Sequence, residues 1–305
     1  MTATALATTI LTFTAIVAVG AVLRLTGVLS REDARPINAI IIYAALPAFI
    51  FRSVYGAELR QELLGVVAVA WGVFAVMAGL AWIAARALKL PRPTAGGFII
   101  VTALGNTGYI GYPVTQALFG ATALPEAVFY DVFGTVGALV FVGLLVAQRY
   151  GDNDEAHVNP LRELVTFPAV IALAVALLLR SVPIPELVSS GLGLLANMVA
   201  PLIMLSVGMS LRFSTLGRAA GPLAVVSVLR LIVAPAIALG LGMLLLGSGV
   251  PLRLAVLQAG MPSMMLTLVV GERFGLDSDF IASAIFVTTA LSAVALPLGQ
   301  LVAFR

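Results

Sequence analysis

The stretch Gly105-Asn106-Thr107-Gly108-Tyr109-Ile110-Gly111-Tyr112-Pro113 lies inside an apolar segment that runs from about Ala95 to Phe119. A helix that spans a lipid bilayer must satisfy its own backbone hydrogen bonds, because lipid offers no partners. Each glycine costs such a helix about 1 kcal/mol relative to alanine, and Pro113 removes a donor. A break of this kind is tolerated at membrane depth only where it is buried in protein or lines a cavity. The stretch therefore predicts a broken transmembrane helix with a binding site at its break.

The composition of the chain indicates a membrane protein. Of the 305 residues, 61% are hydrophobic and only 10% are charged, and the mean hydropathy is +1.11. Soluble domains carry about 25% charged residues. Since a span needs about 20 apolar residues, we expect an all-α polytopic protein with ten transmembrane helices. The expected spans are residues 3–23, 36–55, 62–85, 95–119, 125–148, 164–181, 186–211, 221–246, 251–271 and 279–303.

The charged residues indicate topology rather than a charged partner. The net charge of +3 does not indicate nucleic acid binding, because the basic residues lie at helix ends and form no patch. Most of the 17 basic residues fall in the connections after the odd-numbered spans, which predicts that these connections are cytoplasmic. We therefore expect a multi-pass protein of the cell (inner) membrane with both termini outside, in the periplasm. Cysteine is absent and His157 stands alone in a polar loop, so we expect no metal site and no cofactor.

A polar linker divides the chain into two halves. Residues 149–163 separate residues 1–148, which hold spans 1–5, from residues 164–305, which hold spans 6–10. With five spans in each half, the second half enters from the opposite side, which predicts an inverted repeat. Prolines interrupt the halves at matching places. Pro47 in span 2 matches Pro201 in span 7, and Pro113 in span 4 matches Pro262 in span 9.

The paired breaks in spans 4 and 9 predict an anion site. The second half of each broken span begins near the middle of the bilayer, so two positive helix N-termini are expected to meet there. Carboxylates suit such a site, and the surrounding residues carry amides, hydroxyls and apolar walls. We expect the substrate-binding residues to be Asn106, Thr107, Gly108, Tyr109, Tyr112, Pro113, Gln258, Met261, Pro262, Ser263 and Met264, with Gln116 and Met265 nearby.

The stretch from Gly105 to Pro113 resembles the fourth-span signature of the auxin efflux carrier family, which includes bacterial transporters and the plant PIN proteins. Residues 230–235 and 258–277 resemble spans 8 and 9 of that family, and residues 201–211 resemble its span 7. The resemblance implies a fold similar to sodium/proton antiporters and bile acid symporters, with spans 4 and 9 crossing at their breaks. Spans 1, 2, 6 and 7 would form a scaffold, often dimeric, and spans 3–5 and 8–10 a mobile transport domain. Family substrates are organic anions such as indole-3-acetate, malate or malonate.

Two ionisable residues are expected inside the membrane, where charges are costly and often functional. Arg230 lies about ten residues into span 8 and Asp131 a turn or two into span 5, at similar depths. We expect them to form a charge pair. The pair is either a structural link between spans 5 and 8, or a positive charge near the anion site with Asp131 as a proton carrier.

Three function classes compete. The first is a secondary transporter of small organic anions that works by alternating access, as an elevator. The second is a sodium- or proton-coupled symporter or antiporter on the same fold. The third, an intramembrane enzyme, is disfavoured because the sequence offers no nucleophile paired with a base.

Overall fold

The computed structural model of the chain describes residues 3–30, 32–58, 60–153, 159–210 and 219–303; His157 lies outside these residues. Six helices in the described residues are long and apolar enough to cross a membrane, or seven if one bent pair counts as a single span. The members of that pair, Pro160–Thr166 and Pro168–Leu179, are bent by 59°. The chain is thus an all-helical, multi-pass membrane protein, as predicted. The ten-span inverted repeat stays a prediction.

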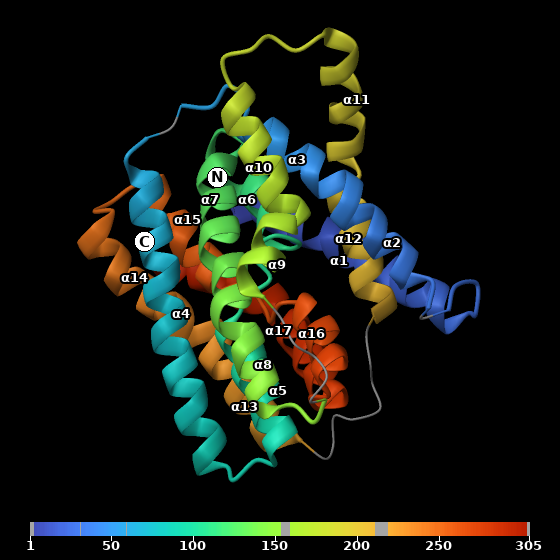
Figure 1. Cartoon of the computed structure of the whole chain (residues 1–305), viewed down its shortest axis with the longest axis vertical. Coiled ribbons are helices and arrows are strands. Elements are labelled where there is room, and N and C mark those ends of the chain that lie inside the picture. The colour runs from blue at the N-terminus through green and yellow to red at the C-terminus, as the bar shows by residue number, and fades with distance from the viewer. Residues whose placement is uncertain (1–2, 31, 59, 154–158, 211–218, 304–305) are drawn as a thin grey trace. The chain divides into compact units, whose positions relative to one another are not determined.

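The chain divides into two compact units, each assembled from several segments (Figure 1). Unit 1 comprises residues 1–60, 108–128 and 165–211, and unit 2 comprises residues 61–107, 129–164 and 212–305. The helices of unit 1 are α1 (Ala3–Leu25), α2 (Ala34–Ile40), η1 (Ile41–Ala45), α3 (Leu46–Val54), α6 (Gly111–Phe119), η2 (Ala121–Ala123), α7 (Leu124–Phe129, which ends one residue past the unit), α10 (Pro168–Leu179), α11 (Glu186–Asn197) and α12 (Val199–Ser210).

Unit 2 is built from twelve helical segments of the described residues. They are α4 (Glu62–Ala87), α5 (Arg92–Ala103), η3 (Tyr130–Val136), η4 (Leu139–Gly143), α8 (Leu144–Tyr150), α9 (Pro160–Thr166, which ends past the unit), α13 (Ala220–Val228), η5 (Leu229–Val233), α14 (Ala234–Leu245), α15 (Val250–Ala259), α16 (Leu266–Phe274) and α17 (Ser278–Ala303).

Unit 1 is held together by close helix packing. Helix α3 packs between α10 and α11, and α1 packs along α12 (Figure 1). The α1–α12 contact depends on two glycines, because a Cβ on Gly20 would collide with the backbone of Leu205 and one on Gly208 with that of Val17. Small residues allow helices to approach closely in a membrane, where packing replaces the hydrophobic effect as the driving force.

In unit 2, α4 packs against α5 and α14, and α17 packs against α13 and α5. Glycine again sets the distances, since a Cβ on Gly72 would lie 2.7 Å from a side-chain carbon of Leu241. The indole N–H of Trp71 donates to the carbonyl of Phe133 at 3.0 Å, which fixes α4 against η3. This packing supports η5 and the C-terminal end of α5, which border the candidate site.

Four segments of the described helices, η1, η3, η4 and η5, form π-helical turns. Two of them end two residues before a proline, since η1 ends at Ala45 before Pro47 and η5 at Val233 before Pro235. Proline has no N–H for the carbonyl one turn earlier, and this loosens the helix at that point. Isolated π turns are frequent at functional sites, and here η3 contains Asp131 and η5 contains Arg230.

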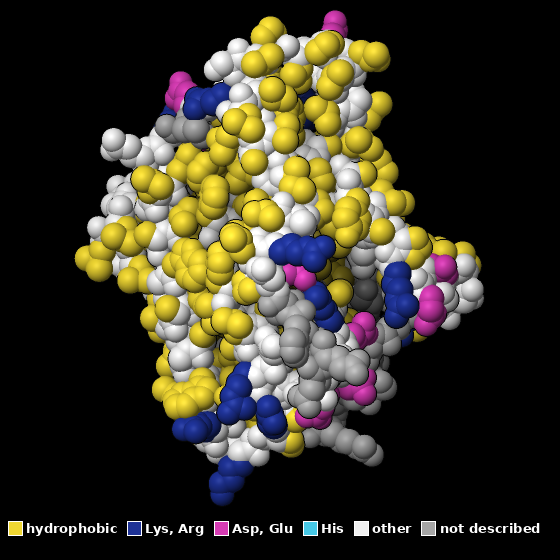
Figure 2. All heavy atoms as spheres, in the orientation of Figure 1, with side chains coloured by type: hydrophobic (Ala, Val, Ile, Leu, Met, Phe, Trp, Pro, Cys, Tyr) yellow, Lys and Arg dark blue, Asp and Glu magenta, His cyan; other side chains and the backbone are white. Residues whose placement is uncertain are grey.

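The visible face of the molecule is mainly hydrophobic, with charged side chains in a few small groups (Figure 2). Large aliphatic side chains are widely exposed in both units, among them Leu187 in α11 and Leu244 in α14. In water such surfaces would promote aggregation, whereas lipid solvates them. The exposed surface therefore fits a bilayer environment.

Candidate functional site

Both helices that the sequence predicts to be broken are interrupted, and the first break lies at residues 104–110, ahead of Pro113, which is in the first turn of α6. Helix α5 ends at Ala103 and α6 begins at Gly111, while α15 ends at Ala259 and α16 begins at Leu266. The intervening residues around Gly105 and Ser263 are not helical. Backbone groups in these stretches need partners other than their own helix.

The two interrupted stretches of unit 2 supply those partners to each other. The N–H of Asn106 donates to the carbonyl of Pro262 at 2.7 Å, and the N–H of Met264 donates to the carbonyl of Leu104 at 3.0 Å. Gly105 and Ser263 form an isolated antiparallel bridge between these bonds. The breaks of the two halves of the chain thus lie side by side and form a short two-stranded crossing.

Arg230 binds the helix ends at the crossing. Its side chain is 2% exposed, and its guanidinium donates to four backbone carbonyls of the described residues. Two of these are the last carbonyls of α5, Thr102 at 3.2 Å and Ala103 at 3.0 Å. The others are those of Ala259, the last residue of α15, and Met261 at 3.0 Å. One cation therefore caps the negative C-terminal ends of two helices at once.

Gly105 leaves the space that this cap needs. A Cβ on Gly105 would lie 3.0 Å from Nη2 of Arg230 and 3.4 Å from the carbonyl oxygen of Met261. A glycine at this position therefore both favours the helix break and leaves room for the guanidinium.

Asp131 also lies at the crossing. Its side chain is buried, and its carboxylate accepts a hydrogen bond of 2.5 Å from the hydroxyl of Thr107. A small cavity of about 10 Å³ lies beside Thr107, Tyr130 and Arg230. Asp131 thus contacts the stretch that follows α5, and Arg230 contacts the last two residues of α5, while their direct pairing stays a prediction.

Several predicted binding residues come together at this crossing in unit 2. Those on the second break, Met261, Pro262, Ser263 and Met264, are buried and adjoin the first break, and Gln258 is buried one turn earlier. The buried polar atoms here that have no hydrogen-bond partner among the described residues include the amide nitrogen Nδ2 of Asn106 and the hydroxyls of Thr102 and Ser263. A buried donor without a partner is costly in a protein, so such atoms are candidates for ligand contacts.

The other predicted residues belong to unit 1. Gly108, Tyr109, Tyr112 and Pro113 lead into α6 or lie within it, and the ring of Tyr112 stacks on that of Phe49 with centroids 5.3 Å apart. Since α6 belongs to unit 1 and α16 to unit 2, the expected meeting of their N-termini stays a prediction.

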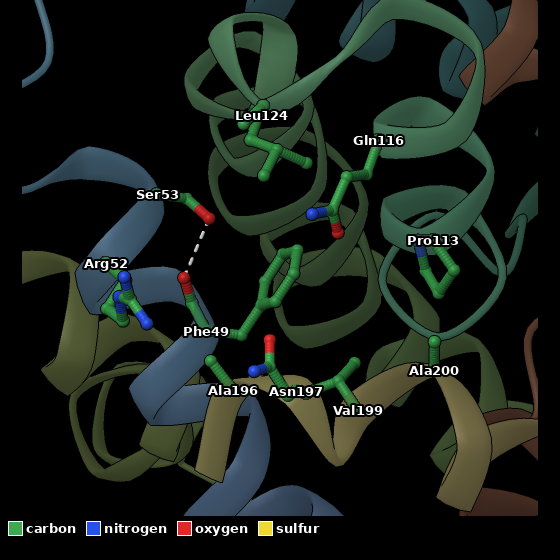
Figure 3. A pocket seen from close by; sticks show the side chains of 11 residues that line it. Phe49, Arg52, Ser53, Pro113, Gln116, Leu124, Ala196, Asn197, Val199 and Ala200 are labelled. Carbon is green, nitrogen blue, oxygen red and sulfur yellow. Dashed lines mark hydrogen bonds between the residues drawn. The ribbon is translucent and has the colours of Figure 1, made fainter. Parts of the chain in front are cut away.

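Unit 1 contains a cavity of about 280 Å³ that the sequence did not reveal (Figure 3). Its polar lining includes Arg52, Gln116 and Asn197. Arg52, near the C-terminal end of α3, is exposed and borders this cavity. A signal was present in the spacing of Phe49, Arg52 and Ser53, which places all three on one face of α3.

The sequence of the chain is similar to a family of membrane proteins and to several individual proteins. The family model described as membrane transport protein matches residues 5–299. An uncharacterized transporter of Methanothermobacter thermautotrophicus is 33% identical over 297 residues, which cover 96% of this chain and 97% of the relative. An uncharacterized transporter of Methanocaldococcus jannaschii is 32% identical over 292 residues, covering 93% and 94%. A protein of Rhizobium meliloti named "Putative malonate transporter" is 25% identical over 273 residues, covering 84% and 82%.

Proposed function

Because this chain belongs to the membrane transport protein family, the auxin efflux carrier family, we propose that it is a secondary transporter of small organic acid anions. Family membership makes the chain a membrane transporter and not an enzyme. The nature of the cargo is the proposed part. One relative carries malonate in its name, and a dicarboxylate of that size is the first substrate to test.

The observation that carries the proposal is the crossing of the two breaks in unit 2. Its hydrogen bonds leave the Nδ2 donor of Asn106 and the hydroxyl of Ser263 buried without protein partners among the described residues. Carboxylate oxygens accept hydrogen bonds and would satisfy such donors. Helix α16 begins at Leu266, directly after the crossing, and its positive N-terminal end adds to the attraction for an anion.

The surroundings of Arg230 favour an anion over a sodium ion as the species bound at the crossing. Unwound carbonyls of broken helices are the usual ligands of a coupling sodium ion in transporters. Here four carbonyls at the ends of α5 and α15 already accept hydrogen bonds from one guanidinium. Arginine keeps its charge in proteins, so the protein provides a permanent cation at this place.

Alternating access is proposed to proceed by an elevator motion. Unit 1 contains the helices of expected spans 1, 2, 6 and 7, and unit 2 contains α4, α5, η3–α8 and α13–α17, which supports a scaffold and a transport domain. Residues 108–128, which hold α6, are grouped with unit 1.

Ten transmembrane spans are also part of the proposal. The count is supported by the seven candidate spans together with α1 and the two interrupted helices, α5–α6 and α15–α16. The outward position of both termini, in the cell membrane, and dimerisation through the scaffold remain part of the proposal.

Counterflow in liposomes tests the transported class directly. We expect purified protein to exchange radiolabelled malonate for unlabelled malonate, and to do so without a sodium gradient. Protein-free liposomes give the background. Failure to exchange malonate, malate or indole-3-acetate under any ion gradient would refute the proposal.

The variant Asn106→Ala tests the proposed contact. Because the amide of Asn106 is buried and offers Nδ2 to the ligand, its loss is expected to weaken malonate binding about tenfold or more. The matched control is Thr289→Val, which removes another buried hydroxyl without a partner among the described residues, outside the two breaks. If Asn106→Ala folds and binds malonate as the unaltered protein does, the anion site lies elsewhere.

Proton coupling is a second candidate, favoured by Asp131. A buried carboxylate within the membrane is the kind of group that proton-coupled carriers use. Asp131 accepts a hydrogen bond from Thr107, one residue after Asn106. If protons are coupled, a pH gradient drives malonate accumulation and Asp131→Asn abolishes that accumulation while exchange persists.

A further inference from the structure

The cavity of unit 1 is built from three parts of the chain that lie far apart in sequence. Helix α3 contributes Phe49, Arg52 and Ser53, and the junction of α11 and α12 contributes Asn197 (Figure 3). The segment from α6 to α7 contributes Gln116 and apolar residues. The volume of about 280 Å³ is near the lower end of the range for small-molecule sites, which begins at about 300 Å³.

Arg52 gives this cavity a positive charge. Neither of the ion pairs found among the described residues involves Arg52, so its guanidinium is available to a ligand. Gly193 on α11 makes room for it, because a Cβ there would collide with Nη1 of Arg52. The guanidinium of an arginine presents parallel N–H groups that match the two oxygens of a carboxylate.

Two amides and an aromatic ring complete the lining. The side chains of Gln116 and Asn197 both point toward the ring of Phe49 (Figure 3). Ser53 also lines the cavity, and its hydroxyl donates to the carbonyl of Phe49 at 2.7 Å. The Phe49 ring is held by its stacking on Tyr112, with an angle of 20° between the rings. Fixed apolar walls with a few convergent polar groups are typical of sites for small organic ligands.

We propose that this cavity is a second binding site for a small organic carboxylate, in which Arg52 binds the carboxylate and Gln116 and Asn197 bind a further polar group. The site takes its ligand class from the proposed function but depends on none of the residues of the crossing. Its single arginine and its size fit a compact acid with two polar ends, such as a short dicarboxylate.

Equilibrium binding of radiolabelled malonate to the purified full-length protein tests the proposal. We expect two sites per chain in the unaltered protein, and Arg52→Gln should weaken one of them about tenfold or more, because a charge-assisted pair is lost. The control Arg60→Gln removes an exposed arginine of the same unit that pairs with Glu58 and should leave both sites unchanged.

A second variant keeps the test valid if Arg52→Gln folds poorly. Asn197→Asp places a negative charge in the cavity and should also weaken one site about tenfold or more, through repulsion of the carboxylate. Thermal unfolding identifies any variant that has lost its structure. Unchanged malonate binding in a folded Arg52→Gln or Asn197→Asp protein overturns the proposal.

The outcomes separate this proposal from the proposed function. Malonate exchange in liposomes with no arginine-dependent site retains the function and rejects the cavity. Arginine-dependent malonate binding that persists in Asn106→Ala supports the cavity, even if the unaltered protein exchanges no malonate.

Discussion

Arg230 shows how a charge can be kept inside a membrane at low cost. The burial of an arginine is expensive unless its donors are satisfied. The helices that end at Ala103 and Ala259 have the complementary difficulty, because their last carbonyls lack partners within the helix. The guanidinium meets both needs at once, and this role requires no carboxylate.

Gly105→Ala tests how rigid this arrangement is. The new Cβ would lie 3.0 Å from Nη2 of Arg230 and 3.3 Å from Cζ, and the guanidinium is held by four carbonyls. We expect a loss of about 1–3 kcal/mol in stability, the usual cost of overpacking, together with weaker malonate exchange. The measurement is thermal unfolding in detergent beside the liposome assay.

Gly79→Ala is the matched control for that prediction. Gly79 lies within α4 of the same unit, and a Cβ there would meet nothing within 4 Å. Alanine should stabilise this helix by up to about 1 kcal/mol. Equal unfolding temperatures for the two variants would show that the guanidinium moves aside freely.

Helix irregularities in this protein have identifiable causes in the sequence. The breaks before α6 and α16 were predictable, because Gly105 and Gly108 or Gly260 and Pro262 interrupt apolar segments of membrane-spanning length, while Pro113 lies in the first turn of α6. The hydrogen bonds between the breaks were not predictable, because they depend on residues far apart in the chain. The carbonyls that hold the guanidinium of Arg230 were not predictable either, because backbone groups carry no sequence signal; its pairing with Asp131 stays a prediction.

Pro235→Ala tests whether the π turn η5 orients Arg230. Alanine restores the N–H that an α-helix would donate to the carbonyl of Leu231, so the helix should straighten and rotate Arg230 away from the crossing. We expect malonate exchange to fall about tenfold or more, since a misplaced group of a site can cost that much. The control Pro251→Ala alters the first turn of α15, where proline removes no helical bond. Normal exchange by Pro235→Ala would mean that η5 does not orient Arg230.

Two compact units assembled from alternating segments of one chain are what a carrier with moving parts requires. The sequence identified the helical class and the membrane environment, because these depend on hydropathy and charge, while the linker between two halves stays a prediction. It did not identify the cavity of unit 1, because Arg52, Gln116 and Asn197 are brought together only by tertiary packing.

Single-molecule fluorescence transfer tests the proposed elevator motion. The chain has no cysteine, so introduced thiols are labelled specifically. With labels at Glu186→Cys in unit 1 and Glu62→Cys in unit 2, we expect malonate to change the populations of at least two distances. Labels at Glu62→Cys and Lys89→Cys, near the two ends of α4, should report one constant distance of about 40 Å. A single distance between the units in all conditions would contradict an elevator.

The cap formed by Arg230 has a consequence for biosynthesis. The carbonyls of Thr102 and Ala103 that it binds precede it in the chain by 128 and 127 residues. While the ribosome is still making the second half, the newly inserted end of α5 therefore has to remain in the membrane without its cation. Nascent chains of this protein should thus depend on insertases or membrane chaperones for longer than proteins whose neighbouring helices complete one another in order of synthesis.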